Sequence, residues 1–436
     1  MLPLIISILS LVVLIRCQEE NCDAACQAAF DKAYAEESSL WVSKDIEAEP
    51  FYQTPANFSG AKTGDLLSWE DITAADIRDN WQIPDGLKLS RFIFVSEDYN
   101  GSPLPASAFA LLPAENSSKP LNPVVWTHGT SGRVQACAPS NHKQLYYGDT
   151  VFNLTKAGYA VIAPDYTGQG TKIPQGFMYE SEFLHAADVA YSLIAARSSP
   201  IGSRLSDSWL VAGHSEGGMT AWRTNERLGR PDQCRLLRAG TFLGAVAIAP
   251  ALRPIDLIPE SFRRAGPDGA VGDVVSAYLL QSFSRLFPTD IREEDYFTDL
   301  ARDRMVLADR ACLQTGEALF QNLTVEQYYK NTSWVSSTTF QVWQESYNGA
   351  GPHRLAAPLL VTQGAADILV YPEFVEKDFN STCAAFSESS AQFNSYAGDD
   401  HEAILTSAEP DYLSWIADRF NGVAITPGCS IHRKSG

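Results

Sequence analysis

The segment GHSEG at residues 213–217 contains Ser215, a residue whose type and sequence context are typical of a catalytic nucleophile. In the pattern G-x-S-x-G the serine lies on a strained turn between a buried strand and a helix. An apolar run at 209–212 precedes the pattern, and residues 216–228 lack proline and can form a helix. The glycines remove side chains that would collide with the neighbouring strand and helix. We therefore predict that Ser215 is a nucleophile; the alternative is a serine in an ordinary loop.

Two downstream residues could activate this serine. A hydroxyl is a weak nucleophile at neutral pH, and a neutral imidazole with a pKa of about 6.5 can take its proton when a carboxylate orients the ring. Asp367 follows an apolar run and the turn at Gly364, and His401 follows the turn GDD at 398–400. The segment between them has room for one helix and one strand. The chain order predicts a triad of Ser215, Asp367 and His401, with a surface-loop histidine as the alternative.

An oxyanion hole would complete this chemistry. One donor in such sites is the backbone N–H of the residue after the nucleophile, here Glu216, and the second comes from the loop after an early strand. The apolar run at 124–126 leads directly into the segment HGT at 128–130. We predict the N–H of Thr130 as the second donor, with Gly129 as the other candidate.

The elements that must position these residues alternate along the chain. Residues 18–80 predict an irregular lead-in with a possible short helix at 24–35. Segments 90–98 and 106–114 predict an antiparallel pair of strands. Further apolar runs at 124–126, 159–166, 209–212 and 244–250 predict more strands. Residues 145–158 and 180–197 predict helices, and the second has the apolar spacing of an amphipathic helix. The alternation predicts an α/β fold whose mostly parallel sheet has helices on both faces.

The alternation stops after Pro250. Residues 251–350 contain no clear strand, and segments 272–287 and 297–323 have helical patterns. Such a stretch is too long for an ordinary loop, so we predict a helical cap inserted over the active site. The apolar residues of the cap either pack it onto the body or line a pocket for an acyl chain. They are Val274, Val275, Leu279, Leu280, Phe283, Leu286 and Phe287.

The N-terminus and the surface predict a secreted protein. Residues 2–15 are apolar and short for a bilayer span, which predicts a signal peptide at residues 1–17 cleaved between 17 and 21; a signal anchor is the alternative.

The chain has eight cysteines, and seven remain once Cys17 is removed with the signal peptide. One cysteine is therefore free or paired elsewhere, and the spacing does not assign the pairs. Seven sequons are candidate N-glycosylation sites: Asn57, Asn100, Asn116, Asn153, Asn322, Asn331 and Asn380.

The composition of the chain limits the classes of molecule that the protein is expected to bind. The net charge of −19 argues against nucleic acid and anionic membranes as partners, and a hydrophobic content of 45% suits a large core. No cysteine or histidine group has metal-ligand spacing, so we predict no metal and no cofactor. We expect an ester substrate, no stable membrane span and a monomer, and contact with a lipid interface stays open.

Five segments resemble a known family when they are taken together: VVWTHGTSG, AVIAPDYTGQG, LVAGHSEGG, PLLVTQGAAD and AGDDHEAI. Their order is similar to that of the fungal secretory lipase family, the lipase-A type of α/β-hydrolase, from about residue 50 to the end. The resemblance implies the α/β-hydrolase fold, the triad Ser215, Asp367 and His401, and a helical lid at the predicted cap. It also suggests two disulfides, Cys137–Cys312 and Cys383–Cys429.

These expectations divide the chain into a signal peptide (1–17), a first part of the core (18–250), a helical cap or lid (251–350) and a second part of the core (351–436). They favour a secreted serine carboxylic ester hydrolase that works through an acyl-enzyme on acylglycerols or other lipid esters. An esterase that deacetylates a small acylated secondary metabolite, such as a fungal toxin, is the alternative. A serine peptidase and a catalytically inactive binding domain also stay open. An epoxide hydrolase or dehalogenase is disfavoured because the turn carries serine and not aspartate.

Overall fold

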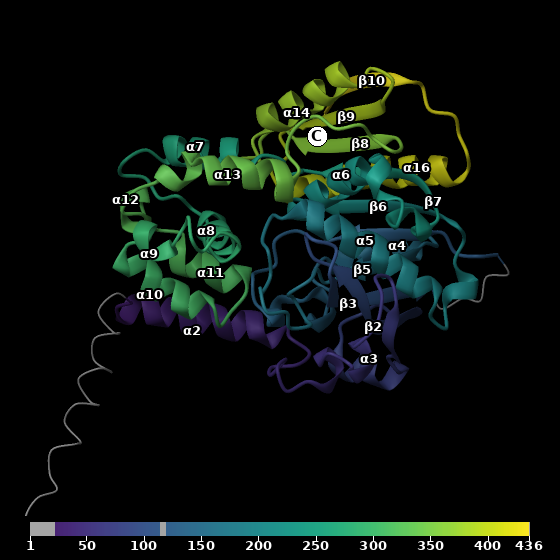
Figure 1. The fold of residues 1–436 in the computed structure, drawn as a ribbon, viewed down its shortest axis with the longest axis horizontal. Coiled ribbons are helices and arrows are strands. Elements are labelled where there is room, and N and C mark those ends of the chain that lie inside the picture. The colour runs from purple at the N-terminus through teal and green to yellow at the C-terminus, as the bar shows by residue number, and fades with distance from the viewer. Residues whose placement is uncertain (1–21, 114–118, 436) are drawn as a thin grey trace, which may run out of the picture.

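The computed structural model describes residues 22–113 and 119–435. The predicted signal peptide at 1–17, its cleavage region and the sequon at Asn116 lie outside the described residues. Figure 1 shows a sheet with its covering helices on one side of the molecule and a group of helices beside it.

Ten strands form one sheet in the order β1-β2-β3-β5-β4-β6-β7-β8-β9-β10. The pairs β1–β2, β2–β3 and β3–β5 are antiparallel, and every pair from β5 to β10 is parallel. The mostly parallel sheet and the early antiparallel pair are therefore confirmed. The strands are β1 (Leu66–Asp71), β2 (Leu87–Glu97), β3 (Pro103–Pro113), β4 (Pro123–Thr127), β5 (Ala160–Pro164), β6 (Ser208–His214), β7 (Thr241–Ile248), β8 (Leu359–Gly364), β9 (Ser390–Ala397) and β10 (Gly428–Ser435).

Alternate residues of the central strands face two helical layers, because successive side chains of a strand point to opposite faces. Val125 and Val211 belong to one buried cluster, and their neighbours Val124 and Leu210 belong to another. The first cluster includes residues of α5 (Glu182–Arg197), α6 (Glu216–Leu228) and α14 (Pro372–Ala385), and the second includes residues of α4 (Gly148–Lys156), α15 (Ala403–Ser407) and α16 (Glu409–Phe420).

Helix α5 differs from its prediction. It was expected to be amphipathic, but every residue from His185 to Ala196 is buried. The helix packs against β2, β5 and α6 and also against the segment at 344–348, so no broad face is left for solvent. The amphipathic prediction is wrong because it assumed a single buried face.

Residues 254–348, which we call the insertion, fold almost entirely as helices. They are α7 (Pro254–Ala265), α8 (Val275–Leu286), α9 (Glu293–Tyr296), α10 (Asp299–Ala308), α11 (Leu313–Phe320), α12 (Val325–Tyr328) and α13 (Thr338–Trp343). The insertion shares a buried core with residues outside it, such as Phe30 and Tyr166. This core includes Val274, Leu280 and Phe283 from the predicted pocket candidates. These three side chains therefore hold the insertion together.

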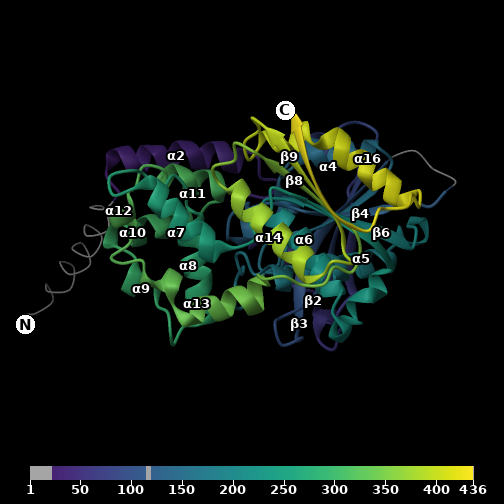
Figure 2. The same cartoon turned by 90° about the horizontal axis from the view of Figure 1, so that it is seen from above.

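The N-terminal segment contains the predicted short helix in a longer form and is otherwise more ordered than the predicted irregular lead-in. It contains the 16-residue helix α2 (Ala24–Ser39), the edge strand β1 and the short helix α3 (Ala74–Asn80). Helix α2 runs along the insertion in both views of the molecule (Figures 1 and 2). The buried carboxylate of Glu37 on α2 accepts hydrogen bonds from the Cys312 N–H (2.8 Å) and the Thr315 hydroxyl (2.8 Å). This carboxylate ties α2 to the start of α11.

The described residues contain three disulfides: Cys22–Cys26, Cys137–Cys312 and Cys383–Cys429. The two pairs that the family resemblance suggested are both among them. Cys137–Cys312 joins the loop after β4 to the insertion, and Cys234 is free and exposed. Among the described helices, none is both long and apolar enough to cross a bilayer.

Loss of the Cys137–Cys312 disulfide should destabilise the protein more than loss of Cys22–Cys26. A crosslink restricts the unfolded chain more when it closes a longer loop, and the two sequence separations are 175 and 4. We expect the Cys137→Ser/Cys312→Ser variant to lose about 2–5 kcal/mol of unfolding free energy in a urea titration. Cys22→Ser/Cys26→Ser is the control, and an equal or larger loss in this control would contradict the expectation.

Candidate active site

Ser215 lies on a sharp turn between β6 and α6. Its backbone has φ 58° and ψ −122°, a conformation that costs a non-glycine residue about 1–3 kcal/mol. The glycines around it have the predicted steric role. A Cβ atom at Gly217 would lie 2.0 Å from the Thr127 carbonyl oxygen, and one at Gly218 would lie 2.4 Å from the Ile248 carbonyl oxygen. Only glycine at these positions lets α6 approach β4 and β7.

His401 and Asp367 lie in direct contact. His401 Nδ1 is 2.7 Å from Asp367 Oδ2, and both side chains are buried. The other carboxylate oxygen, Oδ1, accepts the N–H groups of Leu369 (2.9 Å) and Val370 (2.8 Å). Gln363 Nε2 donates to Oδ2 at 3.0 Å. These donors fix the carboxylate so that it orients the imidazole.

The structure brings Ser215 and His401 to the wall of one cavity of about 520 Å³. No direct hydrogen bond joins Ser215 and His401 among the described contacts. Such bonds are often long in ligand-free enzymes and tighten when substrate binds. The cavity lies between the carboxyl ends of the strands and the insertion, whose residues Leu257, Ile258 and Leu279 form part of its wall.

Thr130, the predicted second oxyanion donor, also lines this cavity. Its carbonyl oxygen accepts the Tyr146 hydroxyl, and its own hydroxyl lies 2.8 Å from the Tyr179 hydroxyl. Gly129 lies next to the elbow, since a Cβ atom there would be 3.2 Å from the Ser215 Cβ. Gly129 is therefore adjacent to the nucleophile and Thr130 lines the same cavity, and which of the two donates stays a prediction.

His214 holds the loop that carries His401, a role that the sequence did not suggest. His214 Nε2 lies 2.8 Å from the His401 carbonyl oxygen, and Nδ1 lies 2.8 Å from the Tyr147 hydroxyl. Burial and the nearby His401 lower the pKa of His214 far below its usual value, so its ring is neutral. A carbonyl only accepts hydrogen bonds, so Nε2 carries the proton and Nδ1 accepts from Tyr147.

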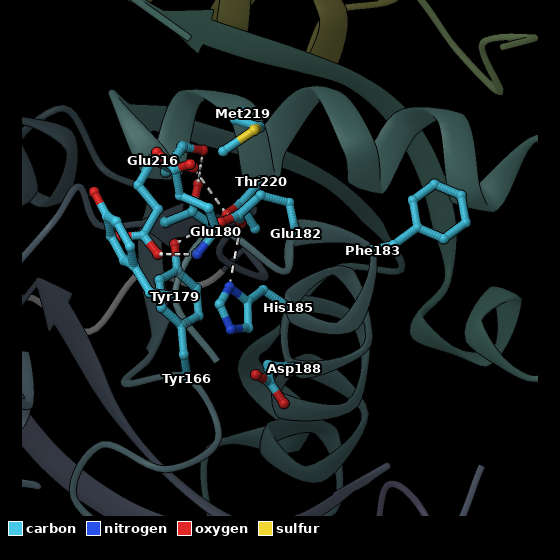
Figure 3. Close-up of polar contacts among 12 residues, drawn as sticks. Tyr166, Tyr179, Glu180, Glu182, Phe183, His185, Asp188, Glu216, Met219 and Thr220 are labelled. Atoms are coloured by element: carbon cyan, nitrogen blue, oxygen red, sulfur yellow. Dashed lines mark hydrogen bonds and ion pairs between the residues drawn. The ribbon is translucent and has the colours of Figure 1, made fainter. Parts of the chain in front are cut away.

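A group of buried acidic residues lies beside the elbow. Figure 3 shows Glu182 and His185 on α5 facing Glu216 and Thr220 on α6. Glu182 Oε2 accepts the Thr220 hydroxyl and lies 3.2 Å from His185 Nδ1, and the Glu180 N–H donates to Glu216 Oε1 at 3.3 Å. The second oxygens of Glu182 and Glu216 have no partner. The side chain of Glu216 is therefore enclosed in this group.

Burial keeps these carboxyl groups protonated. It raises the pKa of Glu182 to about 8, although hydrogen bonds with Thr220 and Glu216 and the charge of Arg223 lower it. The pKa values of Glu180 and Glu216 are raised far above the usual range, first by burial and then by the neighbouring carboxyl groups. Protonation removes the cost of burying like charges without a counter-ion.

Two groups of described residues bring three possible metal ligands within 4.8 Å of one another. One consists of Glu182, His185 and Glu216, whose carboxyl groups are those that hold protons. The other consists of His214, His401 and Glu402. In the second group the ring nitrogens of His214 already have protein partners.

Comparisons with known proteins agree with this geometry. A model of the alpha/beta hydrolase family matches residues 124–404, more than half of the chain. Lipase 4 of Candida albicans is 24% identical over 408 residues, which cover 87% of this chain and 83% of that protein. The closed-state structure of Candida antarctica lipase A has a TM-score of 0.68, with 13% identity and 87% of each chain covered. The rice cell wall degrading esterase LipA from Xanthomonas oryzae has a TM-score of 0.64, with 18% identity, and covers 82% of this chain and 98% of that one.

The chain belongs to the alpha/beta hydrolase family. The predicted fold class and the resemblance to lipases of the lipase-A type are thereby confirmed. The predicted enzyme class, carboxylic ester hydrolase, is confirmed as a class, because these relatives and structural neighbours are named as lipases or esterases.

Substitution of Glu182 by Gln should change how stability depends on pH. The folded-state pKa of Glu182 is raised to about 8 from an ordinary value of 4.5. The contribution of Glu182 to the free energy of unfolding is therefore complete below pH 4.5 and is lost as the pH rises to 8. Gln cannot ionise, so the melting temperature of Glu182→Gln relative to the wild type should increase between pH 5 and pH 8.

An exposed carboxylate, Glu326→Gln, is the matched control and should show no such trend. A difference between Glu182→Gln and the wild type that stays constant or falls with pH would contradict a protonated Glu182. Melting curves at several pH values, read by circular dichroism, would measure the effect.

Proposed function

We propose that this protein is a secreted serine carboxylic ester hydrolase that uses Ser215, His401 and Asp367. The observation that carries the proposal is the convergence of the strained Ser215 and the His401–Asp367 pair on one cavity. The names of the relatives favour ester substrates over the amide substrates of a peptidase. Because the insertion covers the cavity and contributes apolar wall, lipid esters are the favoured substrates and the insertion acts as a lid.

The reaction follows from these positions. His401 takes the proton of Ser215 as the hydroxyl oxygen attacks the ester carbonyl. The N–H groups of Glu216 and Thr130 stabilise the oxyanion, and each such donor contributes roughly 2.7–4 kcal/mol to the transition state. His401 then protonates the leaving alcohol, and water attacks the acyl-enzyme in the second half of the cycle. Asp367 holds the ring of His401 in the required orientation throughout.

The surface is compatible with secretion. Five predicted sequons have exposed asparagines: Asn57, Asn100, Asn322, Asn331 and Asn380. Asn153 is half-buried, and its amide donates to both oxygens of Glu409 (3.1 and 3.0 Å), so it is a poorer acceptor for a glycan. The three disulfides suit an oxidising compartment.

A second candidate is an esterase that deacetylates a small acylated metabolite. The observation that favours it is the cavity itself, because 520 Å³ is in the range of pockets that enclose a small ligand. The acyl-chain profile separates the two candidates.

The first test is hydrolysis of p-nitrophenyl esters from acetate to palmitate by the wild type and Ser215→Ala. We expect Ser215→Ala to lose at least about 10³-fold of kcat, since a nucleophile has no substitute in this mechanism. A maximum at long chains supports a lipase, and a maximum at acetate supports the deacetylating esterase. Near wild-type hydrolysis by Ser215→Ala would overturn the mechanism.

Replacement of His214 by Phe should lower kcat about tenfold with little change in KM. Phe keeps an aromatic ring at this position but loses the hydrogen bond to the His401 carbonyl. Tyr147→Phe removes the second partner of His214 and should shift kcat in the same direction. Both variants leave a buried polar group without its hydrogen-bond partner, so we expect the melting temperature to fall as well, and kcat is measured well below it. A change confined to KM would show that His214 acts on substrate binding and not on His401.

A further inference from the structure

The cavity at Ser215 is unusually acidic. Among the described residues that line it, four carry a carboxyl group and one carries a guanidinium group. The carboxyl groups belong to Glu180, Asp273, Glu317 and Glu402. They come from four different parts of the chain: the loop before α5, the loop before α8, helix α11 and the loop after β9. Folding therefore gathers these carboxyl groups around the space that a substrate must enter.

The single guanidinium group in the wall is already paired. Arg264 Nε donates to Glu260 at 2.8 Å, and another nitrogen of the same group donates to Glu373. The guanidinium carbon also lies 3.7 Å from the ring centroid of Tyr371. Arg264 is thus held by two carboxylates that lie outside the cavity wall, and none of the four cavity carboxyl groups forms an ion pair with a described residue.

Glu180 is the most enclosed of the four and has no side-chain partner. Its exposed fraction is 8%, and its carboxyl group accepts no hydrogen bond from the described residues. Its backbone is also unusual, with φ 56°. A buried carboxyl group without a partner is costly, and it borders the cavity rather than packing against apolar side chains alone.

The cavity carboxyl groups act on one another. Burial raises the pKa of Glu317 to about 7, and the charges of Asp273 and Glu402 raise it further. Burial also raises the pKa of Asp273 to about 6, against hydrogen bonds from the Ser276 and Val275 N–H groups. Asp273 and Glu317 resist ionisation first because they are buried, and Glu317 also because its charge would meet other carboxylates.

Aromatic rings stand among these carboxyl groups. The cavity is lined by Phe262 of α7 and by four tyrosines outside the insertion, Tyr146, Tyr147, Tyr179 and Tyr371. The faces of such rings attract cations, most strongly a quaternary ammonium group that is poorly hydrated. Carboxylates and aromatic faces together form a wall that favours an organic cation.

We propose that this cavity selects esters that carry an alkylammonium group and that Asp273 and Glu317 determine this specificity. The proposal rests on the proposed function, since it names the substrate class of the same site. A cationic substrate relieves the repulsion among the wall carboxylates, whereas a neutral substrate of equal shape leaves it in place. An anionic ester meets the same wall as a repulsive surface and is excluded.

A matched pair of substrates isolates the charge. Butyrylcholine and 3,3-dimethylbutyl butyrate have nearly the same shape, because a quaternary carbon in one replaces the nitrogen in the other. The net charge of −19 attracts every cation weakly, but at 0.15 M salt this long-range field is screened beyond about 8 Å. A preference that remains at this ionic strength comes from groups close to the bound substrate.

The test measures kcat/KM for both esters with the wild type, with Asp273→Asn/Glu317→Gln and with Glu326→Gln as an exposed control. We expect the wild type to prefer the cationic ester by at least about tenfold, a difference that two nearby carboxylates at an effective dielectric of about 20 readily supply. The double variant should lose most of this preference, which is read as the ratio of kcat/KM for the cationic ester to kcat/KM for the neutral ester. Glu326→Gln should keep the wild-type preference.

Binding to Ser215→Ala, measured by calorimetry with the same two esters, keeps the two proposals distinguishable. A cation preference in binding without any ester hydrolysis by the wild type would overturn the proposed function and leave this inference standing. Equal binding and equal hydrolysis of the two esters would overturn the inference and leave the ester hydrolase in place. A preference that survives unchanged in the double variant would also overturn it, since Asp273 and Glu317 would then not be its source.

Discussion

The close contact of α6 with the central strands is the constraint on which the rest of the structure depends. Ser215 keeps its strained backbone only because the turn is held on both sides: its N–H donates to the Ile248 carbonyl (2.9 Å), and Gly217 lies against the Thr127 backbone. β6 lies between β4 and β7, so the strand that carries the serine cannot shift without breaking two parallel ladders. Strain of this kind persists where the surroundings over-determine it, and here the surroundings are the middle of a ten-stranded sheet.

This close approach also buries polar groups, and the protein compensates for them in two ways. Arg223 pairs with Glu226, and Arg227 pairs with Glu97, each at 2.7 Å, so these charges cancel inside the protein. Glu182 and Glu216 lack such partners and keep protons instead, as the raised pKa values indicate.

A neutral Glu216 has a consequence for the chemistry that we propose. Its N–H points toward a developing oxyanion, and an ionised carboxylate on the same residue would oppose that charge. Burial thus supports the proposed reaction as well as the packing.

The sequence predicted what depends on local pattern and chain order. Steric demands on the elbow glycines act within a few residues, and the positions of Asp367 and His401 follow from strands and turns next to them. The sequence failed where partners are distant. The parallel pairing of β10 with β9 and the edge position of β1 depend on contacts that a short segment does not encode. The role of His214 appears only when the loop of His401, 187 positions later in the sequence, folds back onto it. Helix α5 was misjudged because burial on several sides leaves no periodic signal.

Catalysis and selectivity depend on different parts of this chain. The residues proposed for catalysis are positioned by strand ends and their turns. These strands and turns belong to the fold, which this chain shares with its relatives although only 13–24% of the residues are identical. Much of the cavity wall comes from the insertion, where Asp273 and Glu317 lie. A helical insertion tolerates substitutions on the face that lines a cavity, since its core is made by other residues such as Phe283 and Trp343. The charge of the wall can therefore differ between proteins that share the same core and the same chemistry. For this reason the names of relatives inform the reaction class, while the acidic wall of this particular cavity informs the substrate.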